Sequence, residues 1–204
     1  MKKFMLLVVM AFVCSAMNAQ LVTSTSFKKG KAATTWYVKA GTTLANIDVE
    51  GESFDALFGY NVGIAFDRSI GSGGMFWGSG LQLATKGFKF AYGGDEIKLN
   101  LHKLELPLNL GYKFGVSDDL AIDARVGGFV NFDLFGKETY EEDGYKESVN
   151  LSDFEDWDRL SAGLQFGVGV WYQKLNFNIT YQAGLLEAND AKEKNWMISV
   201  GYAF

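Results

Sequence analysis

The chain has 204 residues with a single proline, a single histidine and a single cysteine, and its formal net charge is −5 at neutral pH. This length suits one domain, and the acidic balance argues against binding to nucleic acid, which needs basic surfaces. Almost half of the residues are hydrophobic, yet no apolar run reaches the roughly 20 residues that a membrane-spanning helix needs. The composition therefore excludes a helical membrane protein, and the spacing of the apolar residues has to decide the fold class.

The first 19 residues have the features of an export signal. Lys2 and Lys3 precede an apolar run of 11 residues, which is followed by small residues. Such a run is too short to span a bilayer as a helix but suits the core of a signal peptide. We predict a signal peptide over 1–19, cleaved after Ala19, and a periplasmic segment over 20–33.

The only cysteine, Cys14, lies inside this predicted signal. The mature chain is therefore expected to have neither a thiol nor a disulfide, which suits an oxidising compartment. It would carry 17 basic and 24 acidic residues, a net charge of about −7. In an alternative reading, Cys14 is the lipidated first residue of a lipoprotein, but Val13 puts a branched side chain where a small one is expected.

Beyond the predicted signal, apolar residues recur at every second position. The segment 104–114 reads LELPLNLGYKF, with an apolar residue at every even number. A period of two is typical of a β-strand with one apolar and one polar face. We predict eight such strands, with apolar sets at 36–44, 58–66, 77–83, 104–114, 120–134, 160–172, 175–185 and 196–204.

Three features favour a membrane barrel over a soluble sandwich. Aromatic residues such as Trp36, Phe66 and Trp196 stand at the ends of the apolar sets, as in the aromatic girdles of membrane barrels. Many intervening positions are glycine, which suits the cramped inside of a small barrel. The links also alternate between short and longer, as periplasmic turns and extracellular loops do. The short links are 67–74, 115–118 and 173–174, and the longer ones are 46–55, 87–96, 136–157 and 187–193.

These features predict an all-β fold, an eight-stranded antiparallel up-and-down transmembrane β-barrel over 34–204, with both termini in the periplasm. Pro107 is the one irregularity within a predicted strand. Because proline removes a ladder hydrogen bond, we expect a local bulge there.

Three segments resemble a known family. They are LELPLNLGYKF at 104–114, WYVKAG at 36–41 and VGYAF at 200–204. Together they look like the PorT-like outer-membrane β-barrel family, with an architecture similar to the OmpX and OmpA barrels. The terminal Phe204 resembles the signal read by the barrel-assembly machinery, which the resemblance makes a transient partner. The family's motifs are structural, so the resemblance implies a location and a fold but no catalytic residues.

Four polar residues on the inward faces of two neighbouring strands form a candidate lumen network. Glu105 and Asn109 lie in 104–114, while Asp123 and Arg125 lie in the next strand. A short link joins the strands, so a carboxylate–guanidinium pair inside the barrel is plausible. Such a network fills the lumen in one interpretation and passes protons or ions in the other.

The single histidine, His102, is expected to face outward near the external interface. Folding the third strand onto the fourth about the 87–96 loop brings outward-facing Ser79 within about two residues of it. A serine and a histidine facing lipid could serve lipid hydrolysis. However, lipid A deacylase barrels resemble one another in placing the two residues two apart on one strand, and Leu104 holds that place here.

The segment 136–157 is expected to be a long external loop with eight acidic residues, which could take up a divalent cation but lack the spacing of a calcium loop. At its centre, Asp143-Gly144 between Tyr140 and Tyr145 is a hairpin signal. The flanking strands are therefore expected to continue beyond the membrane as a ribbon, whose edge could recruit a strand from a partner.

We therefore expect a monomer without cofactors in the outer membrane of a Gram-negative bacterium. Its role would be non-enzymatic: structural, surface-interacting or envelope-maintaining. The expected partners are outer-membrane lipid and an extracellular or envelope protein. Transport through a narrow lumen is the main alternative, and lipid modification by Ser79 and His102 is a second.

Overall fold

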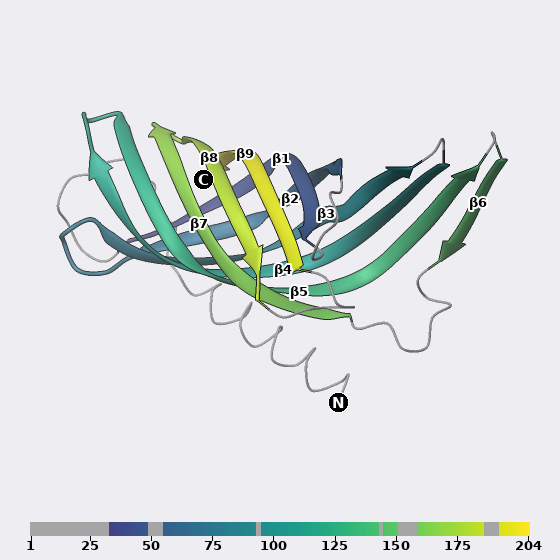
Figure 1. Ribbon diagram of the computed structural model, residues 1–204. Coiled ribbons are helices and arrows are strands. Elements are labelled where there is room, and N and C mark those ends of the chain that lie inside the picture. The colour runs from purple at the N-terminus through teal and green to yellow at the C-terminus, as the bar shows by residue number, and fades with distance from the viewer. Residues whose placement is uncertain (1–32, 49–54, 93–94, 143–144, 151–158, 186–191) are drawn as a thin grey trace.

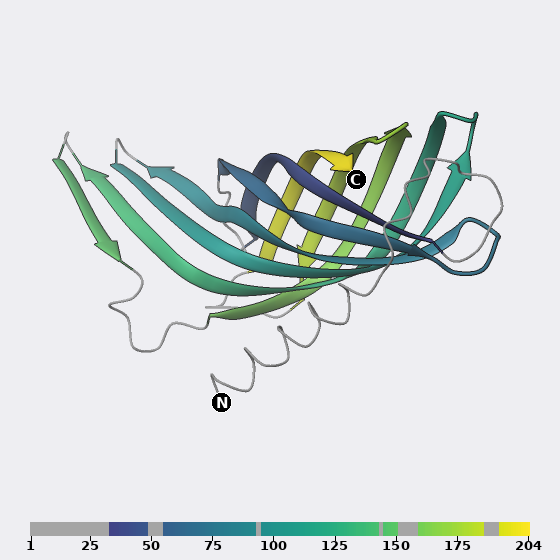
Figure 2. The ribbon, with the colours of Figure 1, turned by 180° about the vertical axis from the view of Figure 1, so that it is seen from behind.

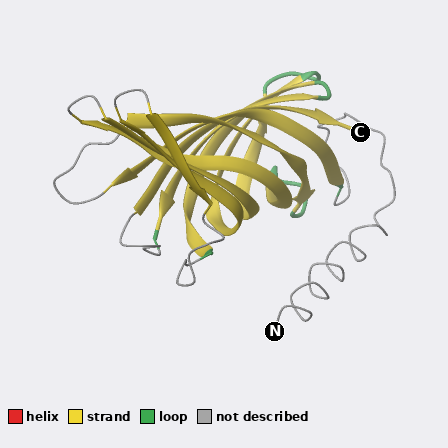
Figure 3. Ribbon diagram, turned by 90° about the vertical axis from the view of Figure 1, so that its right-hand side faces the viewer, coloured by secondary structure: helices red, strands yellow, loops and turns green. Residues whose placement is uncertain are grey.

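The computed structural model describes residues 33–48, 55–92, 95–142, 145–150, 159–185 and 192–204. The predicted signal peptide over 1–19 lies outside these residues, as does nearly all of the predicted periplasmic segment. Every regular element of the described chain is a β-strand (Figure 3). The strands are β1 (Thr34–Asp48), β2 (Asp55–Ser69), β3 (Met75–Tyr92), β4 (Asp95–Gly115), β5 (Leu120–Glu142), β6 (Tyr145–Asn150), β7 (Leu160–Tyr172), β8 (Leu175–Gly184) and β9 (Lys192–Ala203).

Eight of these strands close into an antiparallel barrel. Each pairs with the next along the chain, except that β5 pairs with β7, and β1 completes the ring by pairing with β9 (Figures 1 and 2). The short β6 lies against the C-terminal part of β5 and pairs with no other described strand. The predicted eight-stranded up-and-down barrel is confirmed.

No helix among the described residues is long and apolar enough to cross a membrane.

The two faces of the barrel wall have opposite character, as the period of two predicts. Outward side chains are apolar and exposed, for example Val62, Leu108, Val126 and Ile198. Inward side chains are mostly polar or charged and buried. Small residues allow close strand contact at some inward positions: a Cβ on Gly127 would lie 1.9 Å from the backbone oxygen of Leu108.

The two ends of the barrel differ in the length of their strands. Short turns connect β2 to β3, β4 to β5 and β7 to β8 at the end where the chain also terminates, which we call the periplasmic end. At the other end, β3, β4 and β5 extend well past the remaining strands and, with β6, form a four-stranded sheet that we call the extension (Figure 1). The predicted loop at 87–96 is wrong, because β3 runs to Tyr92 and β4 starts at Asp95.

β4 runs through both the barrel and the extension, and the polarity of its two faces is reversed between them. Its even-numbered side chains point outward and are apolar over 104–114 but polar over 96–102. The inward face changes in the opposite sense, from Lys103 and Glu105 in the barrel to Leu99 in the extension, where Leu99 packs against Phe88. Because lipid favours apolar and water favours polar side chains, this exchange marks the outer boundary of the membrane.

Irregular pairing occurs at this boundary rather than at Pro107. The β4–β5 register shifts between His102 and Lys103, where β5 contains the extra residue Leu134. The expected bulge at Pro107 is wrong, since the register on both sides of it continues unshifted. The hydroxyl of Ser79 donates to the Pro107 carbonyl oxygen at 2.7 Å, so a side chain supports the ladder where the proline interrupts it.

Candidate functional site

The centre of the lumen contains a buried ion pair. Lys86 on β3 donates to Glu105 on β4 at 2.6 Å, and the two side chains are only 1% and 0% exposed. The Lys86 ammonium also lies 4.7 Å from the centroid of the Phe129 ring. A buried pair of this kind needs further hydrogen bonds to offset the loss of hydration.

Amide side chains provide those bonds. Gln182 on β8 accepts from Lys86 at 2.8 Å and donates to Glu105 at 2.8 Å. The same amide nitrogen donates to Gln165 on β7 at 2.9 Å, and Gln165 donates to Asn109 at 2.7 Å. Four strands on opposite sides of the barrel are thereby joined across its axis.

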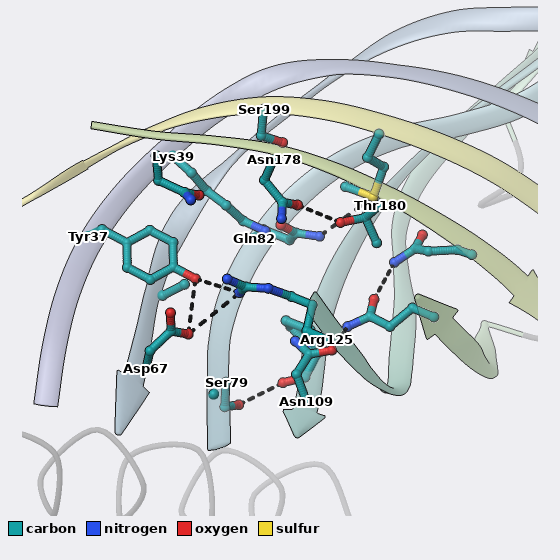
Figure 4. A pocket seen from close by; sticks show the side chains of 17 residues that line it. Tyr37, Lys39, Asp67, Ser79, Gln82, Asn109, Arg125, Asn178, Thr180 and Ser199 are labelled. Atoms are coloured by element: carbon teal, nitrogen blue, oxygen red, sulfur yellow. Dashed lines mark hydrogen bonds and ion pairs between the residues drawn. The ribbon is translucent and has the colours of Figure 1, made fainter. Parts of the chain in front are cut away.

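A second network lies closer to the periplasmic end. Arg125 on β5 contacts Asp123 through Nε at 2.9 Å and Nη2 at 2.8 Å. Its Nη1 donates to the Tyr37 hydroxyl at 3.2 Å and lies 3.5 Å from Asp67 (Figure 4). The indole nitrogen of Trp171 donates to the other oxygen of Asp123 at 2.6 Å. Both oxygens of this carboxylate are therefore engaged.

Aromatic rings and a further cation lie around this second network. Lys113 lies 4.0 Å from the centroid of the Trp171 ring and 3.6 Å from Asp67. The Arg125 guanidinium lies 5.2 Å from the Phe76 ring. Cations over ring faces retain electrostatic stabilisation where water is excluded.

A third group closes the end of the lumen next to the extension. Lys103 forms ion pairs with Asp133 at 3.1 Å and with Glu193. The inward-facing charges therefore balance over the described strands, with five cations and five carboxylates, and the lumen as a whole is neutral. The cations are Lys39, Lys86, Lys103, Lys113 and Arg125, and the carboxylates are Asp67, Glu105, Asp123, Asp133 and Glu193.

The side chains of these networks border a small cavity. A cavity beside Arg125, lined also by Lys39 and Asn178, has a volume of about 30 Å³ (Figure 4). That is room for about two water molecules. The arrangement can hold a few waters among fixed charges, but it does not offer a wide aqueous path.

The four lumen residues singled out in the sequence all turn inward, but they do not form one network. Asp123 and Arg125 are in direct contact, whereas Glu105 pairs with Lys86 and Asn109 with Gln165. Sequence reasoning missed Tyr37, Asp67, Gln165 and Gln182. Their positions alternate with the outward apolar residues, which predicts that they face inward. This alternation does not predict which of them are in contact.

The proposed pairing of Ser79 with His102 is wrong. Ser79 lies opposite Leu108, six residues along β4 from His102, a separation of about 20 Å. The actual partner of His102 on β3 is Thr85. The error arose because the connection between the strands is shorter than expected and centred nearer β4.

The proposed interaction segment lies on the β5–β6 hairpin. Tyr140 and Tyr145 are exposed, and Tyr140 donates to Glu138 at 2.6 Å. Asp143 and Gly144 lie outside the described residues, although Glu142 pairs with Tyr145 across them. The two flanking strands thus pair in the register of the predicted ribbon.

At the opposite end, Phe204 is half exposed and its backbone nitrogen donates to the Trp36 oxygen at 3.1 Å. Its role as an assembly signal stays a prediction.

Part of the acidic segment 136–157 lies outside the described residues. In the part of the chain that the structure describes, no group of three or more His, Cys, Asp or Glu residues could hold a metal ion.

Comparisons with solved structures find other small barrels. Ail, the attachment invasion locus protein of Yersinia pestis, solved with the heparin analogue sucrose octasulfate, is 14% identical with a TM-score of 0.46, covering 84% of this chain and 99% of Ail. Neisserial surface protein A is 13% identical with a TM-score of 0.46, covering 83% and 97%. OprG from Pseudomonas aeruginosa is 16% identical with a TM-score of 0.42, covering 87% and 99%. No curated protein sequence matches the chain.

A sequence comparison with protein families gives a broader match. The family described as outer membrane protein beta-barrel domain matches residues 18–188, which is most of the sequence. Together with the closed eight-stranded barrel and its apolar outer band, this match shows that the chain belongs to the family of outer membrane protein β-barrel domains and resides in an outer membrane.

Proposed function

We propose that the protein is a non-enzymatic surface-interaction barrel, in which the membrane-embedded wall anchors the extension outside the cell. The observation that carries the proposal is the outer edge of β6, which pairs with no strand that the structure describes. Its backbone pairs with β5 on one side and with no described strand on the other. An unpaired edge is a template for a strand from another protein.

The side chains of β6 support this role. Tyr145 is 83% exposed, and Lys146, Glu147 and Ser148 are also exposed. Charged residues on an edge discourage indiscriminate aggregation. The edge therefore suits a selective partner rather than self-association, in keeping with a monomeric barrel.

Site-specific photo-crosslinking in living cells tests the proposal. A photoreactive amino acid in place of Ser148 is expected to give one discrete protein adduct. The matched position is Leu164 on β7, which faces outward within the barrel wall and is expected to give no protein adduct. Absence of any Ser148 adduct, with the barrel folded and exposed on cells, would contradict the proposal.

Narrow-lumen transport is the second candidate, favoured by the cavity beside Arg125 and Lys39. The filled lumen argues against it, because an eight-stranded interior is normally packed with side chains. We expect no stable unitary conductance in planar bilayers. Stable steps that disappear on Arg125→Gln would instead establish a conducting lumen.

Within the barrel family, we assign the chain to the PorT-like group on the segments 36–41, 104–114 and 200–204. In the fold, these segments lie on β1, β4 and β9. The assignment suggests a role at the cell envelope, with the barrel-assembly machinery as a transient partner through Phe204.

A further inference from the structure

Two lysines lie on the outer face of the extension, just above the membrane boundary. Lys98 on β4 is opposite Thr139, and Lys137 on β5 is opposite Asn100. The two lysines are thus diagonal neighbours on adjacent strands. Diagonal neighbours of this kind have Cβ atoms about 7–8 Å apart, within reach of long side chains. Both ammonium groups can therefore approach one small anion.

The other lysines on this face are already neutralised. Lys89 forms an ion pair with Glu96 at 2.6 Å, and Lys146 forms one with Glu141 at 2.8 Å. Lys98 and Lys137, by contrast, form no ion pair with any carboxylate whose side chain the structure describes. Both glutamates of this face, Glu96 and Glu141, lie farther from the boundary than Lys98 and Lys137, so the positive charge is concentrated next to the membrane.

His102 occupies the next position toward the membrane. Its Nδ1 lies 3.2 Å from the Thr85 hydroxyl and 3.4 Å from the Tyr60 hydroxyl. The Phe135 ring packs on the imidazole with a centroid distance of 4.5 Å. When Nδ1 accepts from these hydroxyls, Nε2 carries the ring proton and is a donor. Neighbouring side chains thus hold this imidazole beside the two lysines.

The sign of the charge on this face is unusual for the protein. The whole chain has a net charge of −5, whereas the outer face of the extension has four lysines and two glutamates. Carboxylates on the opposite face, Glu138 and Glu147, point away from it. This face is therefore cationic at the height where the headgroups of the outer leaflet lie.

We propose that Lys98, Lys137 and His102, with the Asn100 amide between them, form a binding site for a phosphate group of an outer-leaflet lipid. Lysine binds phosphate as a point charge, and the apolar band directly below accommodates the acyl chains of the same molecule. The exposed Phe135 lies between the two regions, at the interface where aromatic side chains are favoured. The site goes beyond the proposed partner binding, because it uses the outer face of the extension rather than the edge of β6.

The test compares two double variants refolded in phosphatidylcholine nanodiscs and titrated with bisphosphorylated lipid A. Lys98→Gln/Lys137→Gln removes the two unneutralised lysines, and Lys89→Gln/Lys146→Gln removes two paired lysines of the same face. The first variant is expected to weaken lipid A binding about tenfold or more, while the matched variant stays within about twofold of the wild type. Heat-modifiable migration on gels verifies that both barrels are folded.

Two further titrations identify the ligand. Lipid A without phosphates is expected to bind the wild type as weakly as the bisphosphorylated form binds Lys98→Gln/Lys137→Gln. Inorganic phosphate is expected to shift the His102 NMR signals only at concentrations far above those of lipid A. Equal losses in the two double variants, undiminished binding of the dephosphorylated lipid, or inorganic phosphate binding as tight as lipid A would each overturn the lipid-phosphate site. Photo-crosslinking through Ser148 is a separate measurement, so the two proposals fail independently.

Discussion

The barrel and the extension are built from the same strands but distribute polarity in opposite ways. In the barrel, β4 directs Leu108 outward and Glu105 inward, whereas in the extension it directs Lys98 outward and Leu99 inward. The strand is continuous and its alternation is unbroken. The period of two therefore specifies a strand, while the surrounding medium determines which face is apolar.

This contrast has consequences for how each region uses charge. The barrel buries its ion pairs in a lumen with little free space, where an unpaired charge is costly. The extension places its pairs in water, where exposed pairs contribute little to stability. The same kind of substitution should thus have very different effects in the two regions.

The largest effect is expected from breaking the buried pair. Glu105→Gln leaves the Lys86 ammonium without its carboxylate and should lower the free energy of unfolding by about 3–5 kcal/mol. Glu141→Gln, which breaks the exposed pair with Lys146 in the extension, should cause no measurable change. Denaturant unfolding of the folded barrels in lipid vesicles measures both.

A double variant shows whether uncompensated charge is the cause. Lys86→Met/Glu105→Gln removes both charges and should be more stable than Glu105→Gln alone. If Glu105→Gln and Glu141→Gln destabilised the protein equally, the lumen would have to be as hydrated as the extension, and the contrast between the regions would fail.

Introducing a lysine on the outer surface should give the next largest effect. Leu108→Lys places a charge on the lipid-facing band and should cost about 2–4 kcal/mol if the position lies near the bilayer midplane. Ser148→Lys on β6 is the matched change in the extension and should stay within about 0.5 kcal/mol. The same unfolding measurement separates them, and equal costs would place the membrane boundary elsewhere.

The sequence alone was sufficient for the barrel and insufficient for the upper parts of β3 and β4. The residues KGFKFAY at 86–92 do alternate, but Phe88 and Phe90 face inward. A search for outward apolar sets therefore assigns them to a loop. The pairing of β5 with β6 could be predicted from the Asp143-Gly144 signal, because a turn signal depends on local backbone preferences and not on the medium.

The lumen networks set a different limit. The alternation of polar and apolar residues predicts that Glu105 and Arg125 face inward. It does not predict their partners, because Glu105 accepts from Gln182, which is 77 residues away. Which inward side chains meet across the axis depends on the register of all eight strands. The sequence predicts a β3–β4 turn centred about two residues too early, which displaces the expected partner of Ser79 on β4 by four residues, because an error in the position of a turn is carried along the whole strand.

The smallest expected effect concerns the phenol of Tyr140 in the extension. Its hydrogen bond to the Glu138 carboxylate, partial burial and the negative charge of Glu138 raise the pKa of Tyr140 above its ordinary value. Because the folded state holds this proton more tightly, the stabilisation is complete below the ordinary tyrosine pKa and is lost as the pH rises through the raised value. Glu138→Gln keeps an acceptor but removes the charge, so the pKa of Tyr140 should fall, while stability near neutral pH changes little. NMR titration of carbon-13-labelled tyrosine follows this shift, with the wild-type protein titrated under the same conditions as the reference. An unchanged Tyr140 pKa in Glu138→Gln would mean that water screens this pair in solution. Electrostatic interactions would then be weak on the inner face of the extension as well as on its outer face.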